Sequence, residues 1–256
     1  MNPSSVSEPF NLPPSKQPRS GQLQSICERI LSRFDVVEKE ILIAQIPFSI
    51  LKVRDTNTLV DSIDPTSFSV DERLPYWADI WTSAIELARF CLTDADLNGK
   101  HVLELGCGLG LAGIAAAKAG AHIIFSDYEE DALDFARWNA NKNLPSETID
   151  SRVGFSILDW RALDEFLPRQ QKFDMIIAAD VVYERRNFFP LMDVLQRLLA
   201  PTGTAIFTEP GRTIGDQFFK LLHEAEFDLS IKQCSVELDG KTTGVRRAVI
   251  RSGKKA

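Results

Sequence analysis

The sequence HVLELGCGLGLAGIAAAKAGAHIIFSD, residues 101–127, decides the fold. An apolar, strand-like segment leads into three alternating glycines, Gly106, Gly108 and Gly110, and a helical pattern starts directly after them. Glycine allows a sharp backbone turn and lets a ligand approach where a side chain would collide. A second apolar segment ends at Asp127, 21 positions beyond Gly106, where a carboxylate accepts hydrogen bonds from both hydroxyls of a ribose. The stretch therefore predicts a strand–loop–helix–strand unit that binds a nucleoside.

The segments that follow continue the alternation of strand and helix. Strands are predicted at residues 101–105, 121–126, 152–158, 173–179 and 204–208, and helices at 111–119, 129–143, 187–200 and 213–225. Such alternation predicts a parallel sheet wound on both faces. Two last strands, residues 229–238 and 245–251, are joined by a short turn, which connects only antiparallel neighbours. We expect an α/β fold: a Rossmann-like, doubly wound, seven-stranded mixed sheet with a C-terminal antiparallel hairpin.

Three regions are expected along the chain. Residues 1–20 are rich in Ser and Pro and predict a flexible tail. Residues 21–70 predict an N-terminal α+β accessory extension, and residues 71–256 the catalytic domain. Within the extension we expect a helix at residues 23–34 and strands at 36–43 and 48–53.

Composition limits the classes of partner. The formal net charge of -7 leaves no broad basic surface, so nucleic acid is not expected as a partner. The first twenty residues lack an apolar signal-peptide core, and no segment has the roughly 20 apolar residues that span a bilayer. We expect a cytoplasmic protein without a membrane partner. The four cysteines and three histidines are scattered, so neither a metal site nor a disulfide framework is predicted.

Glu104 bears on which nucleoside cofactor binds. Gly108, Gly110 and Gly113 also satisfy G-x-G-x-x-G, a weak pattern that is shared with dinucleotide-binding proteins. Glu104 interrupts an apolar strand, where an unpaired carboxylate is costly. The ammonium and sulfonium of S-adenosylmethionine would stabilise it, whereas the pyrophosphate of a dinucleotide would be repelled. Glu104 therefore favours the methyl donor.

These residues resemble the first motif of class I methyltransferases, E-x-G-x-G-x-G, which here is Glu104, Gly106, Gly108 and Gly110. The resemblance extends over about residues 75–251 and implies S-adenosylmethionine as the cofactor. It implies that the glycine loop lies against the methionine moiety and that the acid after the second strand, Asp127, holds the ribose.

Asp159 and Trp160 follow the third strand of the predicted sheet. At that position an acid can receive the adenine amino group and an aromatic ring can cover the base. Core packing is an equally good interpretation of Trp160. Both residues are included in the predicted cofactor site.

Asp180-Val181-Val182-Tyr183 follows the fourth strand, at the sheet edge where open α/β folds bind ligands. This segment resembles the D-x-x-Y signature of the seven-β-strand protein lysine methyltransferases, methyltransferase family 16. Trp81 is similar to a tryptophan that these enzymes place beside the cofactor. The segments LPYWADIW and Glu209-Pro-Gly-Arg are similar to the branch of electron-transfer-flavoprotein β-subunit lysine methyltransferases.

The resemblance implies a protein-lysine N-methyltransferase whose partner is a protein substrate. A lysine ammonium has a pKa of about 10.4 and must lose a proton before it attacks a methyl group. Asp180 would orient it, Tyr183 would line its channel and Glu209 would assist from the next loop. The alternative for Asp180 and Tyr183 is a purely structural role, with Asp180 capping the following helix and Tyr183 packing beneath it.

Three other functions remain possible at this point. A small-molecule methyltransferase would use LPYWADIW and EPGR to enclose a metabolite. A nicotinamide-dependent oxidoreductase would use the G-x-G-x-x-G pattern, although the chain lacks a second nucleotide-binding half. A non-catalytic module would bind the cofactor and regulate a partner. The substrate protein, the number of methyl groups added and the oligomeric state are not predicted.

Overall fold

The computed structural model describes residues 19–61, 74–165 and 172–253. Most of the predicted tail, residues 1–18, lies outside this part of the chain, as do residues 62–73 at the predicted domain boundary. None of the helices within the described ranges combines the length and the apolar character that crossing a membrane requires.

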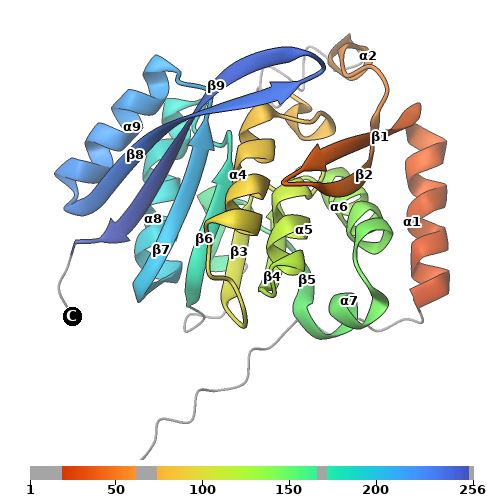
Figure 1. Ribbon diagram of the computed structural model, residues 1–256, viewed down its shortest axis with the longest axis horizontal. Coiled ribbons are helices and arrows are strands. Elements are labelled where there is room, and N and C mark those ends of the chain that lie inside the picture. The colour runs from red at the N-terminus through yellow and green to blue at the C-terminus, as the bar shows by residue number, and fades with distance from the viewer. Residues whose placement is uncertain (1–18, 62–73, 166–171, 254–256) are drawn as a thin grey trace, which may run out of the picture.

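Seven strands form one mixed sheet in the order β5-β4-β3-β6-β7-β9-β8 (Figure 1). They are β3 (His101–Leu105), β4 (His122–Asp127), β5 (Val153–Ile157), β6 (Phe173–Ala179), β7 (Leu199–Glu209), β8 (Phe227–Leu238) and β9 (Lys241–Ser252). Strands β3 to β7 are parallel to one another, and β9 runs antiparallel to both β7 and β8. The predicted Rossmann-like sheet with an antiparallel C-terminal hairpin is therefore confirmed.

Helices cover both faces of the sheet, because successive apolar side chains of a strand point to opposite faces and both faces must be buried. On β3, Val102 belongs to one buried cluster, while Leu103 and Leu105 belong to the other. The first cluster lies beneath α4 (Thr82–Thr93), α5 (Leu111–Lys118) and α6 (Glu130–Asn143), and the second beneath α8 (Phe188–Leu198) and α9 (Thr213–Glu224). Short helices join these elements: α7 (Ser146–Arg152), η1 (Tyr76–Ala78), η2 (Trp160–Glu165) and η3 (Arg185–Asn187).

The N-terminal segment packs on the outer side of α6 (Figure 1). It consists of α1 (Arg19–Arg33), the antiparallel pair β1 (Val36–Ile43) and β2 (Ile46–Val53), and the short α2 (Asn57–Asp61). Asn139 and Asn143 of α6 each bond both the N–H and the C=O of one β2 residue, Leu51 and Ser49 respectively, at 2.7–3.1 Å. Two side-chain amides on α6 thus bond β2 as a neighbouring strand would.

The order of the strands places a ligand crevice between β3 and β6. From β3 the chain moves to β4 and β5 on one side of the sheet, and it then crosses to β6 and β7 on the other side. Open α/β sheets bind ligands where the strand order reverses, at the carboxyl ends of the strands. The glycine loop after β3 and Asp180 after β6 therefore meet at this point.

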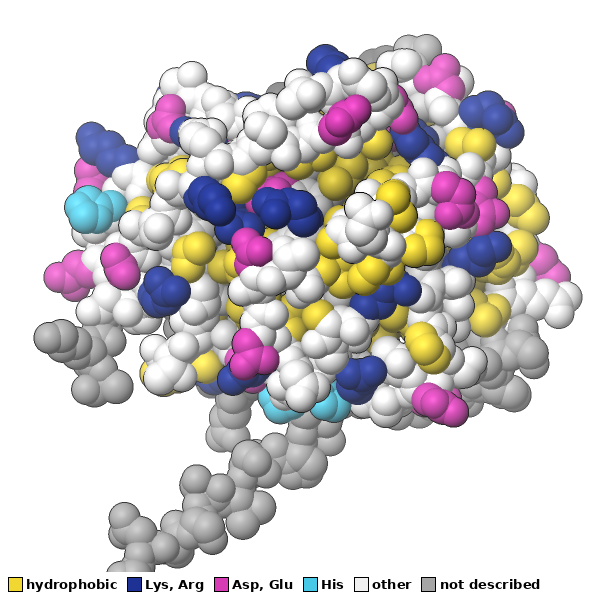
Figure 2. Space-filling model, viewed as in Figure 1, with side chains coloured by type: hydrophobic (Ala, Val, Ile, Leu, Met, Phe, Trp, Pro, Cys, Tyr) yellow, Lys and Arg dark blue, Asp and Glu magenta, His cyan; other side chains and the backbone are white. Residues whose placement is uncertain are grey.

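Charge is spread evenly over the face seen in Figure 2. Basic and acidic side chains are interspersed there, and the described residues of this face form no broad area of one sign. This distribution agrees with the moderate net charge of -7.

Candidate active site

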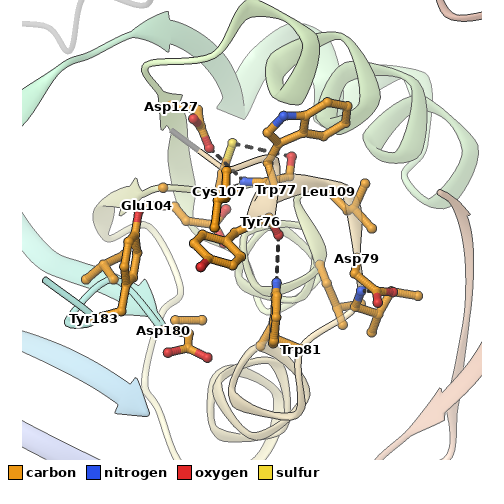
Figure 3. Close-up of a pocket in the computed structure, with 18 of the residues that line it drawn as sticks. Tyr76, Trp77, Asp79, Trp81, Glu104, Cys107, Leu109, Asp127, Asp180 and Tyr183 are labelled. Carbon is orange, nitrogen blue, oxygen red and sulfur yellow. Dashed lines mark hydrogen bonds between the residues drawn. The ribbon is translucent and has the colours of Figure 1, made fainter. Parts of the chain in front are cut away.

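A cavity of about 350 Å³ opens at the carboxyl ends of the parallel strands. Its walls come from the glycine loop after β3, the ends of β4 and β6, and the aromatic segment that precedes α4. In the view of Figure 3, Asp127 lies at one end of the group of side chains and Asp180 at the other, with Glu104 and Tyr76 between them. The volume falls within the range of roughly 300–1,000 Å³ that is usual for small-molecule sites.

The glycine loop adopts a backbone that other residues rarely take. Gly106, Gly108 and Gly110 have φ values of 59°, 50° and 82°, in the left-handed region. Gly113 has a different reason to be glycine, since a Cβ there would lie 2.3 Å from Oε2 of Glu104 and 2.3 Å from the Phe125 ring. The spacing that resembles a dinucleotide motif is thus explained by room for Glu104 and Phe125.

Glu104 is a buried carboxylate that lines the cavity. Its Oε2 has no hydrogen-bond partner within the protein. Burial, together with the nearby charge of Asp127, raises the pKa of Glu104 well above its ordinary value. A buried, unpartnered carboxylate is costly, and a cationic ligand removes that cost. The site therefore fits the ammonium and sulfonium of S-adenosylmethionine.

Asp127 lies at the end of β4, where the loop amides hold its side chain. Oδ2 accepts a hydrogen bond from the Gly108 N–H at 3.0 Å, and Oδ1 accepts one from the Glu129 N–H at 3.1 Å. Burial raises the pKa of Asp127 to about 6, although these amides oppose the shift. The carboxylate is thus fixed in direction before a ligand arrives, as a ribose-binding acid requires.

Asp159 and Trp160 differ in their relation to the main cavity. Trp160 is buried and lines the cavity, with its ring 3.5 Å from the position of a Cβ on Gly106. Asp159 lies outside the main cavity, in a smaller hollow of about 20 Å³ that shares Trp160 and Tyr128 with it. Its carboxylate accepts hydrogen bonds from the Arg161 guanidinium. The structure therefore brings Trp160, and not Asp159, into direct contact with the main cavity.

Asp180 lies at the other end of the cavity in an unusual backbone conformation. Its φ is 56°, and its N–H donates to the carbonyl of Thr208 on β7 at 2.7 Å. A non-glycine residue in the left-handed region is strained, and such strain concentrates at functional sites. Burial raises the pKa of Asp180, while the guanidinium of Arg212, which bonds both carboxylate oxygens, opposes that shift.

Tyr183 packs against the aromatic segment before α4. Its ring contacts that of Tyr76 edge-on at 5.3 Å, and Tyr76 in turn contacts Trp81 at 6.1 Å. The Trp81 indole N–H donates to the carbonyl of Tyr76 at 2.7 Å, as Figure 3 shows. Burial and neighbouring negative charges raise the pKa of Tyr183 to about 12. Tyr183 therefore remains a neutral phenol that can donate a hydrogen bond.

Glu209 does not line the cavity. Its buried carboxylate points into the loop that follows β7, where Oε2 accepts hydrogen bonds from the N–H groups of Gly211 and Arg212 at 2.8 and 2.9 Å. Its other oxygen pairs with Arg246 on β9. The geometry gives Glu209 the task of shaping the loop that presents Arg212.

Several cavity residues were not among the predicted site residues. Tyr76, Trp77 and Asp79 come from the aromatic segment before α4, whose density of aromatics was the available signal. Arg212 closes the loop motif Glu209-Pro-Gly-Arg, which by itself does not indicate a place in the site. Its contact with Asp180 joins positions 32 apart in the chain, and no local pattern reveals such a pair.

The fold and the cavity together define a class I methyltransferase, whose methyl donor is S-adenosylmethionine. The profile of the lysine methyltransferase family, methyltransferase family 16, matches residues 75–225, which is more than half of the chain. The chain therefore belongs to the lysine methyltransferase family. This match sets aside the nicotinamide-dependent alternative.

Individual relatives agree with the family assignment. Protein N-lysine methyltransferase METTL21A of Danio rerio is 38% identical over 128 residues, which are 50% of this chain and 57% of that protein. EEF1A lysine methyltransferase 3 of Mus musculus is 30% identical over 164 residues, 63% of this chain and 68% of that protein. The alignment thus spans little more than half of the Danio rerio relative. These relatives bear on the family, and the branch within it stays a prediction.

A solved structure shares the fold. Magnesium protoporphyrin IX methyltransferase of Synechocystis PCC 6803, determined with bound SAM, has a TM-score of 0.52 and 21% identity. The match covers 77% of this chain and 98% of that one. At this identity the likeness supports the fold alone.

Proposed function

We propose that this protein transfers a methyl group from S-adenosylmethionine to the side-chain nitrogen of a lysine in a protein substrate. Family membership supports the reaction class. The identity of the acceptor is argued from Asp180. Its backbone is strained, and its carboxylate is largely buried at the end of the cavity opposite to Asp127. Asp180 can accept a hydrogen bond from a lysine nitrogen. The acids on the described cavity walls outnumber the one basic side chain, and this negative potential attracts a cationic amine and disfavours an anionic metabolite.

Each group in the cavity has a distinct task in this proposal. The cofactor supplies a methyl group already activated by its sulfonium. Asp127 holds the ribose and Glu104 faces the cationic part of the cofactor. Asp180 orients the lysine nitrogen by accepting a hydrogen bond from it. Tyr183 lines the lysine channel, where its hydroxyl can donate a hydrogen bond and its ring can pack against the lysine side chain. The protein thus contributes alignment and exclusion of water, which suffice for an in-line displacement.

The entrance to the cavity suits an alkyl chain. Tyr76 and Trp81 line the cavity and are partly exposed, and the Trp81 indole N–H donates to the Tyr76 carbonyl. Aromatic faces pack against the methylene groups of a lysine and attract its ammonium through cation–π interactions. An arginine or histidine would offer a planar, wider group to the same entrance.

Labelled methyl transfer into a cell lysate tests the acceptor. The full-length protein and methyl-labelled S-adenosylmethionine are incubated with lysate that has been divided into metabolite and protein fractions. We expect label in protein and, after hydrolysis, on methylated lysine. Label confined to metabolites would support the small-molecule alternative. Label on histidine, as in the name of the Dictyostelium discoideum relative histidine protein methyltransferase 1 homolog, would contradict the acceptor and leave the fold and cofactor intact.

Asp180→Asn tests whether the carboxylate serves turnover. The substitution keeps the shape of the side chain and removes its charge. We expect the affinity for S-adenosylhomocysteine to stay close to that of the wild type, while methylation of lysate protein falls sharply. Normal methylation by this variant would reduce Asp180 to a structural residue.

A further inference from the structure

Arg212 is the only basic side chain among the described residues that line the cavity. The same walls carry five carboxylic acids: Asp79, Glu104, Asp127, Asp180 and Glu184. The guanidinium of Arg212 contacts one of these acids, with Nη1 bonding Oδ1 of Asp180 and Nη2 lying 3.2 Å from Oδ2. The acceptor end of an acidic cavity is therefore locally neutral.

The loop that carries Arg212 is fixed by a buried ion pair beneath it. Glu209 binds the N–H of Arg212, and Arg246 donates from Nη2 to the Arg212 carbonyl at 3.0 Å. Glu209 and Arg246 also pair with each other, with the two side chains 1% and 13% exposed. Gly211 turns the chain with a φ of 82°. Both polar groups of the Arg212 backbone are thus held, which leaves its side chain directed at Asp180.

Asp180 is held from its own side in the same way. Its N–H bonds the carbonyl of Thr208, and β6 and β7 pair directly before the two loops, with Ala179 opposite Thr208. The carboxylate and the guanidinium therefore meet on two adjacent, anchored strand ends. A carboxylate has about four lone-pair positions, so Asp180 retains acceptor capacity for a further N–H group.

The chemistry of lysine methylation makes this neutralisation useful. An unpaired carboxylate within about 4–6 Å of an ammonium stabilises its charged form by one to three pKa units. Only the neutral amine carries the lone pair that attacks a methyl group. A bare Asp180 would therefore bind the lysine well and keep it in the unreactive form.

Resting on the proposed lysine methylation, we propose that Arg212 is a positioning residue that neutralises Asp180, so that a lysine entering the cavity releases its proton before methyl transfer. The proton leaves to solvent through the cavity mouth. The neutral lysine nitrogen then forms the new C–N bond while the C–S bond breaks and its electron pair stays on sulfur. The positive charge ends on the methylated nitrogen, so atoms and charge balance.

Other charged and titratable groups surround this pair. Glu209 from the end of β7 adds negative potential at Asp180. The further groups on the cavity wall are Tyr76 and Asp79 before α4, Glu104 on β3, Cys107 after β3, Asp127 on β4, Tyr128 after β4, and Tyr183 and Glu184 after β6. Lys52 pairs with Asp79, and Arg186 pairs with Glu184. Arg212 is thus the counter-charge that bonds Asp180 itself.

The pH dependence of turnover tests the proposal. The full-length protein and Arg212→Gln are assayed with labelled S-adenosylmethionine on one labelled lysate protein, from about pH 6.5 to about pH 10. We expect Arg212→Gln to be about tenfold or more slower near neutral pH and to approach the wild type at the alkaline end, because the lysine keeps its proton to higher pH. Arg212→Lys retains the charge and should restore most of the wild-type profile below about pH 9.

Two further measurements separate this role from others. In carboxyl-labelled protein saturated with S-adenosylhomocysteine, NMR should show a higher pKa for Asp180 in Arg212→Gln than in the wild type. Arg185→Gln removes an arginine from the segment after β6 that bonds Gln217 instead of Asp180, and it serves as the matched control. This control should keep the wild-type pH profile.

Several results would overturn the proposal. An equal loss of rate at every pH would make Arg212 a structural residue, and so would an Arg212→Lys variant as impaired as Arg212→Gln. A tenfold weaker affinity of Arg212→Gln for S-adenosylhomocysteine would make it a cofactor ligand. If the wild type labels no lysine at any pH, the proposed function itself fails. Should Arg212→Gln not fold, the comparison of Arg212→Lys with the wild type, by NMR and by pH profile, still decides the question.

Discussion

At the scale of single residues, three carboxylates in one cavity have three different environments. Glu104 has a buried oxygen without a partner, Asp127 is held by backbone amides, and Asp180 is paired with Arg212. The chain pattern located all three acids, because each ends or interrupts an apolar strand. It did not reveal their partners, since these depend on which strands become neighbours.

Asp127→Asn should weaken cofactor binding. A carboxylate that accepts hydrogen bonds from ribose hydroxyls makes charge-assisted bonds of about 1.5–3 kcal/mol each, and asparagine keeps one neutral acceptor. We expect the affinity for S-adenosylhomocysteine to fall by about tenfold to a hundredfold, as measured by calorimetry. Asp131→Asn, on the helix that follows, is the control and should bind normally. An Asp127→Asn variant with unchanged affinity would refute the ribose assignment.

The same carboxylate predicts a pH dependence. Burial raises the pKa of Asp127 to about 6, so the native state holds its proton more tightly than the unfolded chain does. Its contribution to stability is therefore fully present below about pH 4 and is lost as the pH rises through about 6. Ligand binding follows the opposite sign, because only the ionised group accepts from both hydroxyls. Between pH 7 and 5, S-adenosylhomocysteine affinity should fall in the wild type more steeply than in Asp127→Asn.

At the scale of elements, the strands and helices of the sheet followed from periodicity, and the differences have local causes. The helix α7 (Ser146–Arg152) was not predicted, since seven mostly polar residues give no apolar period. The strand β2 begins at Ile46 and includes Pro47, because a two-stranded sheet leaves an edge where proline loses no bond. The strand β7 begins at Leu199, where it pairs with Phe173 across a register shift that the sequence does not indicate.

Glu209→Gln distinguishes a structural from a catalytic role for that residue. Removing the charge leaves Arg246 with only the exposed Asp216 as its ion-pair partner, and breaking a buried pair costs up to about 3–5 kcal/mol. We expect a clearly lower free energy of unfolding in urea, together with slower turnover through a loosened Arg212 loop. A variant of wild-type stability with greatly reduced turnover would instead return Glu209 to the chemistry.

Asn139→Ala should loosen both the N-terminal strand pair and the glycine loop. The Asn139 side chain bonds the N–H and C=O of Leu51 and also the carbonyl of Leu109, so its loss leaves buried backbone groups unpaired at about 1–3 kcal/mol each. We expect a lower melting temperature and weaker S-adenosylhomocysteine binding. Asn141→Ala removes an amide that bonds only the Arg137 carbonyl on its own helix, and it should change neither quantity much. Equal effects of the two variants would contradict the assignment.

At the scale of the whole molecule, the described part of the N-terminal segment shares a core with the catalytic domain. Ile26, Ile30, Phe48 and Ile50 are buried in the same cluster as the side chains beneath α4, α5 and α6. Charged contacts follow the same path, since Arg29 bonds both carboxylate oxygens of Asp134 on α6 at 2.7 and 2.8 Å. A division of the chain near residue 70 therefore does not separate two hydrophobic cores.

Two truncations test this unity. A chain that starts at residue 19 keeps every side chain of the described core, so its melting temperature and its S-adenosylhomocysteine affinity should match those of the full chain.

A chain that starts at residue 54 loses α1, β1 and β2, and it uncovers Trp77 and Phe135, whose rings contact Phe34 at 5.6 and 5.5 Å. Seven buried apolar side chains go with the deleted segment: Ile26, Ile30, Ile41, Ile43, Phe48, Ile50 and Val53. At about 1.5–3 kcal/mol each, their burial is comparable to the entire stability of a domain, about 5–15 kcal/mol. The shorter chain should therefore lose cooperative melting and cofactor binding together. Should it melt and bind as the full chain does, residues 19–53 would be a separate module, and their contact with the glycine loop through Asn139 would be dispensable.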